Sequence, residues 1–438
     1  MYAEHKAKTS PNATAQAALL RQKYTHKKEI ANINAEHSKL FKILDIFVLL
    51  TNCLVFIVKF VKILYNIFMK IGIFGGTFNP PHNTHVNIAR QAVAQLRFDK
   101  LLVVPCGIPP HKYCGVDKLV RLQLCNLAFA GVACSDVTEV WDYEIRKDTA
   151  SYTVETLREV KRLYPDSELY LIIGGDSLAN FSKWYRSDEI AGLATLAVAD
   201  REKSGETNEN ETFRLLNANV VHLDVQPNDV SSTEIRLRYQ FGKDNSSYVP
   251  RNVDEFVLKN KLYADYRDTA LKLQGYLKPE RFEHTFYVVK RGLEFASSEE
   301  YGKVFTACLL HDCAKYVSER DYSKYGFECP SNMPKTVVHS FLGAEVAKRD
   351  FNVCDEEVLN AIRYHTTGRP EMTRLDKIVY VADKTEQTRP YPLEHLLSGT
   401  LDEIFLKCLV EANEYRVEAH GDSDFELTNL TLKYYLNA

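Results

Sequence analysis

The stretch Gly72-Ile-Phe-Gly-Gly-Thr-Phe-Asn-Pro-Pro-His-Asn-Thr-His85 follows a short apolar run and leads into a helix-like sequence. Gly75 and Gly76 allow backbone N–H groups to approach a phosphate closely. The helix N-terminus that we expect near Val86 adds positive potential there. His82 and His85, three residues apart, place both imidazoles near one face of this entrance. A glycine-rich turn is a weak signal alone, and such a histidine pair also occurs at surfaces and helix caps.

Short β-rich runs alternate with helix-like stretches from Lys70 to about Leu262. This alternation predicts βαβ units around a parallel sheet. We therefore expect an α/β, Rossmann-like parallel-sheet domain over residues 69–262. Its predicted strands are Ile71–Phe74, Leu101–Pro105, Leu169–Ile173, Leu196–Ala199 and Val220–Val225.

The strand signals nearly vanish after Tyr263. Apolar residues then recur at helical spacing, as in Phe286, Val289 and Leu293,. This pattern predicts an all-α domain over residues 263–438. The seam near residues 261–268 is charged and has no Gly/Pro-rich linker, so we expect the two domains to sit close together.

Length and composition set broad limits on function. At 438 residues the chain exceeds the size at which a single core keeps growing, which favours two or three domains,. A net charge of −3 gives no general attraction to nucleic acid, so we expect no nucleic-acid partner,. The 10 cysteines are scattered and form no CxxC pair, which fits a reducing cytoplasm,. The oligomeric state stays open, a homo-oligomer included.

The first 68 residues do not resemble a catalytic domain. Residues 1–40 are polar and lack a secretory signal, so no export is expected,. The apolar run Ile46–Val58 has 13 residues between Asp45 and Lys59, whereas a single span normally needs about 20. We expect residues 1–68 to be dispensable. The alternative is that residues 41–68 form a membrane anchor or an interfacial helix.

Ser231, Ser232 and Thr233 are typical of a helix N-cap, and Arg236 lies about one turn further on,. Free N–H groups, hydroxyls and a guanidinium can thus converge on one anion. Plain helix capping is the alternative. Three more segments stand between the two motifs, namely Pro109-Pro110-His111-Lys112, Gly174-Gly175-Asp176-Ser177 and Trp184-Tyr185.

In this order, the segments resemble the HxxH nucleotidyltransferases and, more closely, the nicotinate mononucleotide adenylyltransferases, whose usual motif is GGTFDPxHxGH. Asn79 replaces the common Asp and Thr84 the common Gly. The resemblance implies attack of the nicotinate mononucleotide phosphate on the α-phosphate of ATP, bridged by magnesium, to form deamido-NAD and pyrophosphate. Phosphopantetheine or nicotinamide mononucleotide is the alternative acceptor. It implies catalytic roles for His82, His85 and Arg236, and nucleotide contacts from Gly75, Gly76, Thr77, Phe78, His111, Lys112, Gly175, Asp176, Trp184, Tyr185, Ser231, Ser232, Thr233 and Arg236.

The helical half carries histidines and aspartates in or beside apolar, helix-like stretches. Such side chains need partners if they are buried, and a metal can supply them. Six donors exceed what one tetrahedral site can use, so we infer two metals, with Asp312 as a carboxylate able to bridge them. Any one of these histidines alone would more often be an ordinary core or surface residue. The candidate ligands are His284, His311, Asp312, His339, His365 and Asp383.

The order H…HD…H…H…D resembles the HD-domain phosphohydrolases, in particular the bacterial symmetrical diadenosine tetraphosphate hydrolases. The resemblance implies that these six residues bind two metals, iron or else manganese or another divalent ion. It implies a catalytic role for Asp312 and Lys315, phosphate contacts from Thr367 and Arg369, and a dinucleoside polyphosphate substrate. Arg369 could equally be a solvated loop charge. The alternatives are a nucleotide-sensing module without turnover, or another HD nucleotidase or cyclic-dinucleotide phosphodiesterase.

Overall fold

The computed structural model describes residues 11–67, 69–110, 115–130, 136–199, 218–225, 230–420 and 425–436. Its sheet is parallel and has the strand order β3-β2-β1-β4-β5-β6. All five predicted strands are present, and the short β3 was not predicted. The strands are β1 (Lys70–Gly76), β2 (Lys100–Pro105), β3 (Thr138–Val140), β4 (Glu168–Gly174), β5 (Thr195–Ala199) and β6 (Val220–Leu223).

The strand order reverses between β1 and β4, which lie side by side at the centre of the sheet. In open α/β sheets, ligands bind beyond the carboxyl ends of the strands at such a switch point. The loops that follow β1 and β4 therefore flank the expected nucleotide site. Strand β1 ends with Gly75-Gly76, and β4 ends at Gly174, directly before Gly175 begins α5.

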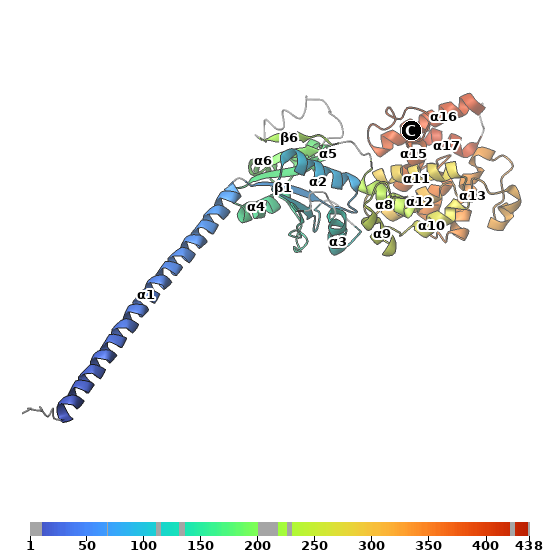
Figure 1. Ribbon diagram of the computed structural model, residues 1–438. Helices are drawn as coiled ribbons and strands as arrows, with labels where there is room; N and C mark the ends of the chain where they lie inside the picture. Colours follow the sequence, from blue (N-terminus) through green and yellow to red (C-terminus); the bar gives the residue numbers. More distant parts are fainter. Residues whose placement is uncertain are drawn as a thin grey trace, which may run out of the picture. The chain divides into compact units, whose positions relative to one another are not determined.

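Helices accompany the sheet in the βαβ pattern (Figure 1). Phe74, Val103 and Ile172 from three strands pack with Leu124 and Val253 from two helices in one buried cluster. The helices of this domain are α2 (Asn83–Leu96), α3 (Lys118–Phe129), α4 (Thr153–Leu163), α5 (Gly175–Ala179), α6 (Ser187–Leu193), α8 (Ser232–Gln240) and α9 (Arg251–Lys259), with a 3₁₀ turn η1 at Phe181–Lys183.

The described residues from 264 onward contain helices and no strand, so the predicted all-α fold of the second half is confirmed. Phe241, which caps α8, packs against Phe282 and Phe286 of α11, so the core of the helical half begins within the preceding sequence. The helices are α10 (Arg267–Gln274), α11 (Pro279–Phe295), α12 (Tyr301–Leu310), α13 (Lys335–Asp350), α14 (Glu356–Tyr364), α15 (Arg374–Thr385), α16 (Leu401–His420) and α17 (Glu426–Leu436), with the 3₁₀ turn η2 at Glu319–Tyr325.

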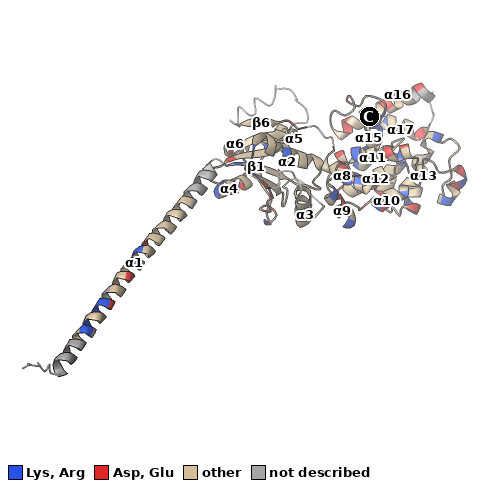
Figure 2. Cartoon of the chain, in the orientation of Figure 1, with Lys and Arg blue, Asp and Glu red and all other residues tan. Residues whose placement is uncertain are grey.

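Helix α1 (Pro11–Ile67) belongs to a separate compact unit, Met1–Met69 with Lys161–Glu168. Its residues Leu19–Ile57 contain a stretch that is long and apolar enough to cross a membrane by length and composition, and none of that stretch is buried. Residues 46–57 carry no charge, as the uncharged part of α1 in Figure 2 illustrates. The cysteines of the described residues are all free.

Candidate active sites

The end of β1 is open at Gly75, and the loop that follows is anchored at its aromatic residue. A Cβ atom at Gly75 would meet nothing within 4 Å. Phe78, by contrast, is buried with a φ of 48°. Its ring packs 5.4 Å from that of Phe74 and 5.1 Å from the imidazole of His85. Gly75 is thus exposed, while Phe78 ties the following loop to the core.

The two motif histidines meet where α2 begins. His82 is the N-cap residue of α2, and its ring centroid lies 3.8 Å from that of His85. The backbone N–H of His82 donates to Nδ1 of His85 at 3.2 Å. A neutral His85 therefore carries its proton on Nε2, the form that can donate a hydrogen bond to a phosphate oxygen.

The start of α8 contacts the same loop. Ser231 caps the helix by accepting the Glu234 N–H at 3.2 Å, as expected. The Ser232 hydroxyl donates to the Pro80 carbonyl at 3.0 Å, and Nη1 of Arg236 donates to the Asn79 carbonyl at 2.9 Å. The structure thus brings the histidine motif and the Ser-Ser-Thr-Glu-Ile-Arg motif together, although 157 positions separate Asn79 from Arg236.

Four of the other predicted nucleotide-contact residues follow β4, and two lie outside the described residues. Gly175 and Asp176 form the first turn of α5, directly after β4. Trp184 follows η1, with its ring 5.6 Å from Phe181, and Tyr185 is 53% exposed and so free to contact a ligand. His111 and Lys112 lie outside the described residues.

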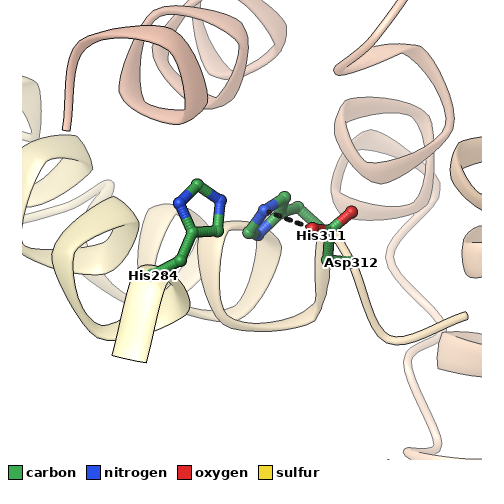
Figure 3. A group of neighbouring side chains, drawn as sticks. All are labelled: His284, His311 and Asp312. Carbon is green, nitrogen blue, oxygen red and sulfur yellow. Dashed lines mark ion pairs between the residues drawn. The ribbon is translucent and has the colours of Figure 1, made fainter. Parts of the chain in front are cut away.

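The candidate metal ligands of the helical half come together from five consecutive helices. Two overlapping groups of donor atoms have the spacing of a metal site, His284 with His311 and Asp312, and Asp312 with His339 and His365. Figure 3 shows the first group, in which the imidazoles of His284 and His311 stand 5.4 Å apart, centroid to centroid. Oδ1 of Asp383 lies 3.2 Å from Nε2 of His284 and completes this group.

Asp312 belongs to both groups through different oxygens. Its Oδ2 lies 3.5 Å from Nε2 of His311. Its Oδ1 lies 3.1 Å from Nε2 of His339 and 3.7 Å from Nε2 of His365. With its two oxygens divided between the two groups, Asp312 could contact an ion in each of them.

The buried nitrogens of this cluster fit a metal. Nε2 of His284 and Nε2 of His311 are buried and make no hydrogen bond within the described part of the chain. Both nevertheless lie within ion-pair range of Asp383, at 3.2 Å and 3.8 Å from its Oδ1. Inward-facing imidazole nitrogens beside carboxylates, buried without proper hydrogen bonds, form the donor set that a divalent cation satisfies.

The charge states of the cluster also suit a metal. Burial, with the neighbouring imidazoles of His311 and His339, holds the pKa of His365 well below its ordinary value. Burial alone would raise the pKa of Asp312, but the imidazoles of His311 and His339 outweigh it and hold that pKa well below the usual range. At neutral pH the structure therefore favours neutral His365 and ionised Asp312, the forms that bind metals.

The remaining predicted residues of this half have protein partners. Nζ of Lys315 lies 3.1 Å from Nε2 of His339, at the edge of the cluster. The Thr367 hydroxyl donates to the Gly368 carbonyl at 2.9 Å, and Nη2 of Arg369 pairs with Asp376 at 2.8 Å. Lys315 thus touches the metal ligands, whereas the contacts of Thr367 and Arg369 lie outside the cluster.

Comparison with known proteins matches each half of the chain to a family. Residues 73–238 match the cytidylyltransferase-like family, and residues 281–388 match the HD domain. A probable nicotinate-nucleotide adenylyltransferase of Clostridium tetani is 36% identical over 200 residues, which are 44% of this chain and 98% of that protein. The chain belongs to the nicotinate-nucleotide adenylyltransferase family.

One relative matches both the adenylyltransferase domain and part of the helical half. A Mycoplasma genitalium protein named probable nicotinate-nucleotide adenylyltransferase/Ap4A hydrolase is 29% identical over 327 residues, 73% of this chain and 88% of that protein. A solved HD superfamily hydrolase of Clostridium acetobutylicum, described as involved in NAD metabolism, is 26% identical and covers 40% of this chain and 97% of its own, with a TM-score of 0.37. By the two family models and the two relatives matched in sequence, the chain joins a nicotinate-nucleotide adenylyltransferase to a domain of the HD hydrolase family.

Within the adenylyltransferase half, sequence reasoning missed Arg121. This side chain is 1% exposed and donates to three carbonyls, those of Thr77 (2.9 Å), Cys106 (2.6 Å) and Gly107 (2.7 Å). It therefore fixes the loop after β1 to the loop after β2. The available signal was a single arginine between the apolar residues Leu119, Val120 and Leu122 of α3.

Within the HD half, sequence reasoning missed two arginines. Nη1 of Arg281 lies 3.1 Å from Oδ2 of Asp312, and Nη2 of Arg389 donates to Oδ1 of Asp383 at 2.6 Å. Each arginine thus pairs with a candidate metal ligand and can also offer N–H groups to a phosphate. Arg281 stands one helical turn before His284, which was a usable signal.

Proposed function

We propose that this chain is a bifunctional enzyme. Its first domain would convert ATP and nicotinate mononucleotide to deamido-NAD and pyrophosphate. Its second would hydrolyse diadenosine tetraphosphate symmetrically to two ADP with the help of a metal pair. We assign residues 69–262 to the first activity and residues 263–438 to the second, and we propose a cytoplasmic enzyme that does not need residues 1–68.

For adenylyl transfer, the supporting observation is the contact between the histidine loop and the start of α8. The acceptor phosphate oxygen forms a bond to the α-phosphorus of ATP, and the bond from that phosphorus to the pyrophosphate oxygen breaks. His82, His85 and Arg236 would donate hydrogen bonds to the phosphate oxygens as charge develops. Magnesium bound with ATP would neutralise the triphosphate. The protein supplies no nucleophile of its own.

For hydrolysis, the observation that carries the proposal is the division of the Asp312 oxygens between two donor groups. When bound, two divalent metals, iron or else manganese, would polarise a phosphoryl oxygen and lower the pKa of water. The six ligands are His284, His311, Asp312, His339, His365 and Asp383. Lys315 and Arg281 stand beside Asp312, where their positive charges can hold the phosphates of the substrate.

Substrate competition tests both halves of this proposal. The purified protein should form deamido-NAD from ATP and nicotinate mononucleotide faster than it uses nicotinamide mononucleotide or phosphopantetheine. With manganese it should convert diadenosine tetraphosphate to ADP without AMP and ATP, since only symmetrical cleavage gives two ADP. Preference for a cyclic dinucleotide or a mononucleotide would replace the hydrolase assignment, and no turnover of any of these would make the HD domain a nucleotide sensor.

A further inference from the structure

In three of the clustered histidines, Nδ1 contacts an oxygen of the protein. Two of them contact a backbone carbonyl, and the third contacts a carboxylate. Nδ1 of His311 lies 2.7 Å from the Cys308 carbonyl, and Nδ1 of His365 lies 2.7 Å from the Ile362 carbonyl. In both cases the acceptor is the backbone carbonyl of the residue three positions earlier. Nδ1 of His284 instead lies 3.2 Å from Oε1 of Glu386, 102 positions away.

The position of each histidine in its helix explains this difference. His311 and His365 are the C-cap residues of α12 and α14. The last carbonyls of a helix have no intrahelical partner, so they can accept from an imidazole. His284 lies in the interior of α11, where the backbone carbonyls are used within the helix,. Its imidazole therefore needs an acceptor from elsewhere in the chain.

Glu386 is built to be that acceptor. It follows α15 directly and is only 1% exposed. Its Oε2 accepts the Thr388 N–H at 2.7 Å, and the Thr388 hydroxyl also donates to the carboxylate. These bonds hold Oε1 toward His284. The Thr388 hydroxyl lies 2.7 Å from Oε1 and 2.8 Å from Oε2, so Thr388 contacts both oxygens of the carboxylate and the His284 imidazole contacts Oε1 as well. A buried carboxylate held by these fixed donors has a defined orientation.

We propose that Glu386 is the positioning residue for His284 in the metal cluster. Its carboxylate keeps the imidazole proton on Nδ1, which directs the lone pair of Nε2 toward Asp383 and His311. A carboxylate behind a histidine ligand also makes the ligating nitrogen more basic. This assignment rests on the metal site proposed above and adds a residue outside its six ligands.

The proposal predicts that loss of Glu386 weakens one metal site and spares the other. His284 belongs to the group with His311, Asp312 and Asp383, whereas the group of His339 and His365 does not contact Glu386 in the described structure. We expect Glu386→Ala to weaken one of two Mn²⁺ sites about 10- to 100-fold, as loss of an outer-shell partner typically does. Glu386→Gln keeps the volume and a carbonyl acceptor, so it should retain part of the affinity.

Titration of the full-length protein with Mn²⁺, followed by electron paramagnetic resonance, measures the number and affinity of the sites without any substrate. The matched control is Glu345→Gln, which removes a carboxylate that pairs with Arg363 at 3.3 Å away from the cluster. Two sites in the wild type, one of them weakened in the order wild type, Gln, Ala, support the proposal. Equal weakening of both sites, or two unchanged sites in both variants, overturns it and leaves the hydrolase proposal standing. Fewer than two sites in the wild type overturn the metal-pair proposal and this assignment with it.

If Glu386→Ala does not fold, the Mn²⁺ titration of Glu386→Gln tests the proposal by itself. Its melting temperature in the presence of a chelator should match that of the control within a few degrees. The loss of affinity at one site is then a property of the metal cluster and not of global stability.

Discussion

The hydroxyl of Tyr263 donates a 2.6 Å hydrogen bond to Oδ1 of Asn79, and both side chains are buried. Asn79 is the residue at which this chain departs from the usual GGTFDP motif, and its carbonyl also accepts from Arg236. Tyr263 stands after α9, where the sheet domain ends. Tyr263, at the seam between the two assigned domains, therefore helps to hold the candidate catalytic loop after β1.

Tyr263→Phe should reduce adenylyl transfer and leave the hydrolase unaffected. The change removes one donor from the buried Asn79, and loss of one such hydrogen bond costs about 0.5–1.5 kcal/mol. The ring remains, so its packing 6.0 Å from Tyr239 is kept. Steady-state rates of deamido-NAD formation, compared with those of the exposed control Tyr434→Phe, test this expectation. Equal rates in both variants would show that the bond does not position the loop.

Arg121→Met should destabilise the adenylyltransferase domain by several kcal/mol, since it removes three hydrogen bonds from a charged donor, each of which contributes about 1.5–3 kcal/mol,. Arg121→Lys should recover only part of this, because an ammonium cannot reproduce the planar fork that now reaches three carbonyls. Residual deamido-NAD formation after stepwise heating measures the effect. Inactivation of the Met variant at the wild-type temperature would contradict a structural role for Arg121.

Glu144→Gln should stabilise the protein increasingly as pH rises. Glu144 is 7% exposed, and burial raises its pKa above the ordinary value despite the hydrogen bond from Thr156. The Glu144 carboxyl then loses its proton at lower pH in the unfolded chain than in the folded chain. The free energy of unfolding of the wild type therefore falls as pH rises from about 4.5 through the raised pKa of the folded state,. Gln keeps the acceptor for Thr156 without the charge. Urea unfolding at several pH values should give a difference that grows with pH and then levels off; a constant difference would argue against a perturbed Glu144.

Deletion of residues 1–68 should leave both activities intact, because the candidate site residues all lie beyond Lys70. Aqueous extraction of cells that express each form, followed by assays of both reactions, measures this directly. Membrane retention of the full-length protein that disappears on deletion would show that α1 is an anchor.

Sequence patterns predicted what is local in the chain. The five longer strands, the capping of α8 by Ser231 and the six clustered ligands each have a signal within a few residues. The strand β3 was missed because it spans only Thr138–Val140 and is not fully buried, so it has neither length nor alternation.

Contacts between distant residues were missed for a different reason. Tyr263 and Asn79 are 184 positions apart, and Glu386 and His284 are 102 apart. A buried tyrosine or glutamate has no sequence signature that names its partner. Only the folded chain shows that these side chains support the two sites.

The most direct test of two independent active sites is one chromatographic product assay on the wild type, His85→Ala and His311→Ala. Each protein receives ATP with nicotinate mononucleotide and, separately, diadenosine tetraphosphate with manganese. We predict that His85→Ala loses deamido-NAD but still forms two ADP, and that His311→Ala shows the reverse. Loss of both activities in either variant, or absence of ADP in the wild type, would contradict the account.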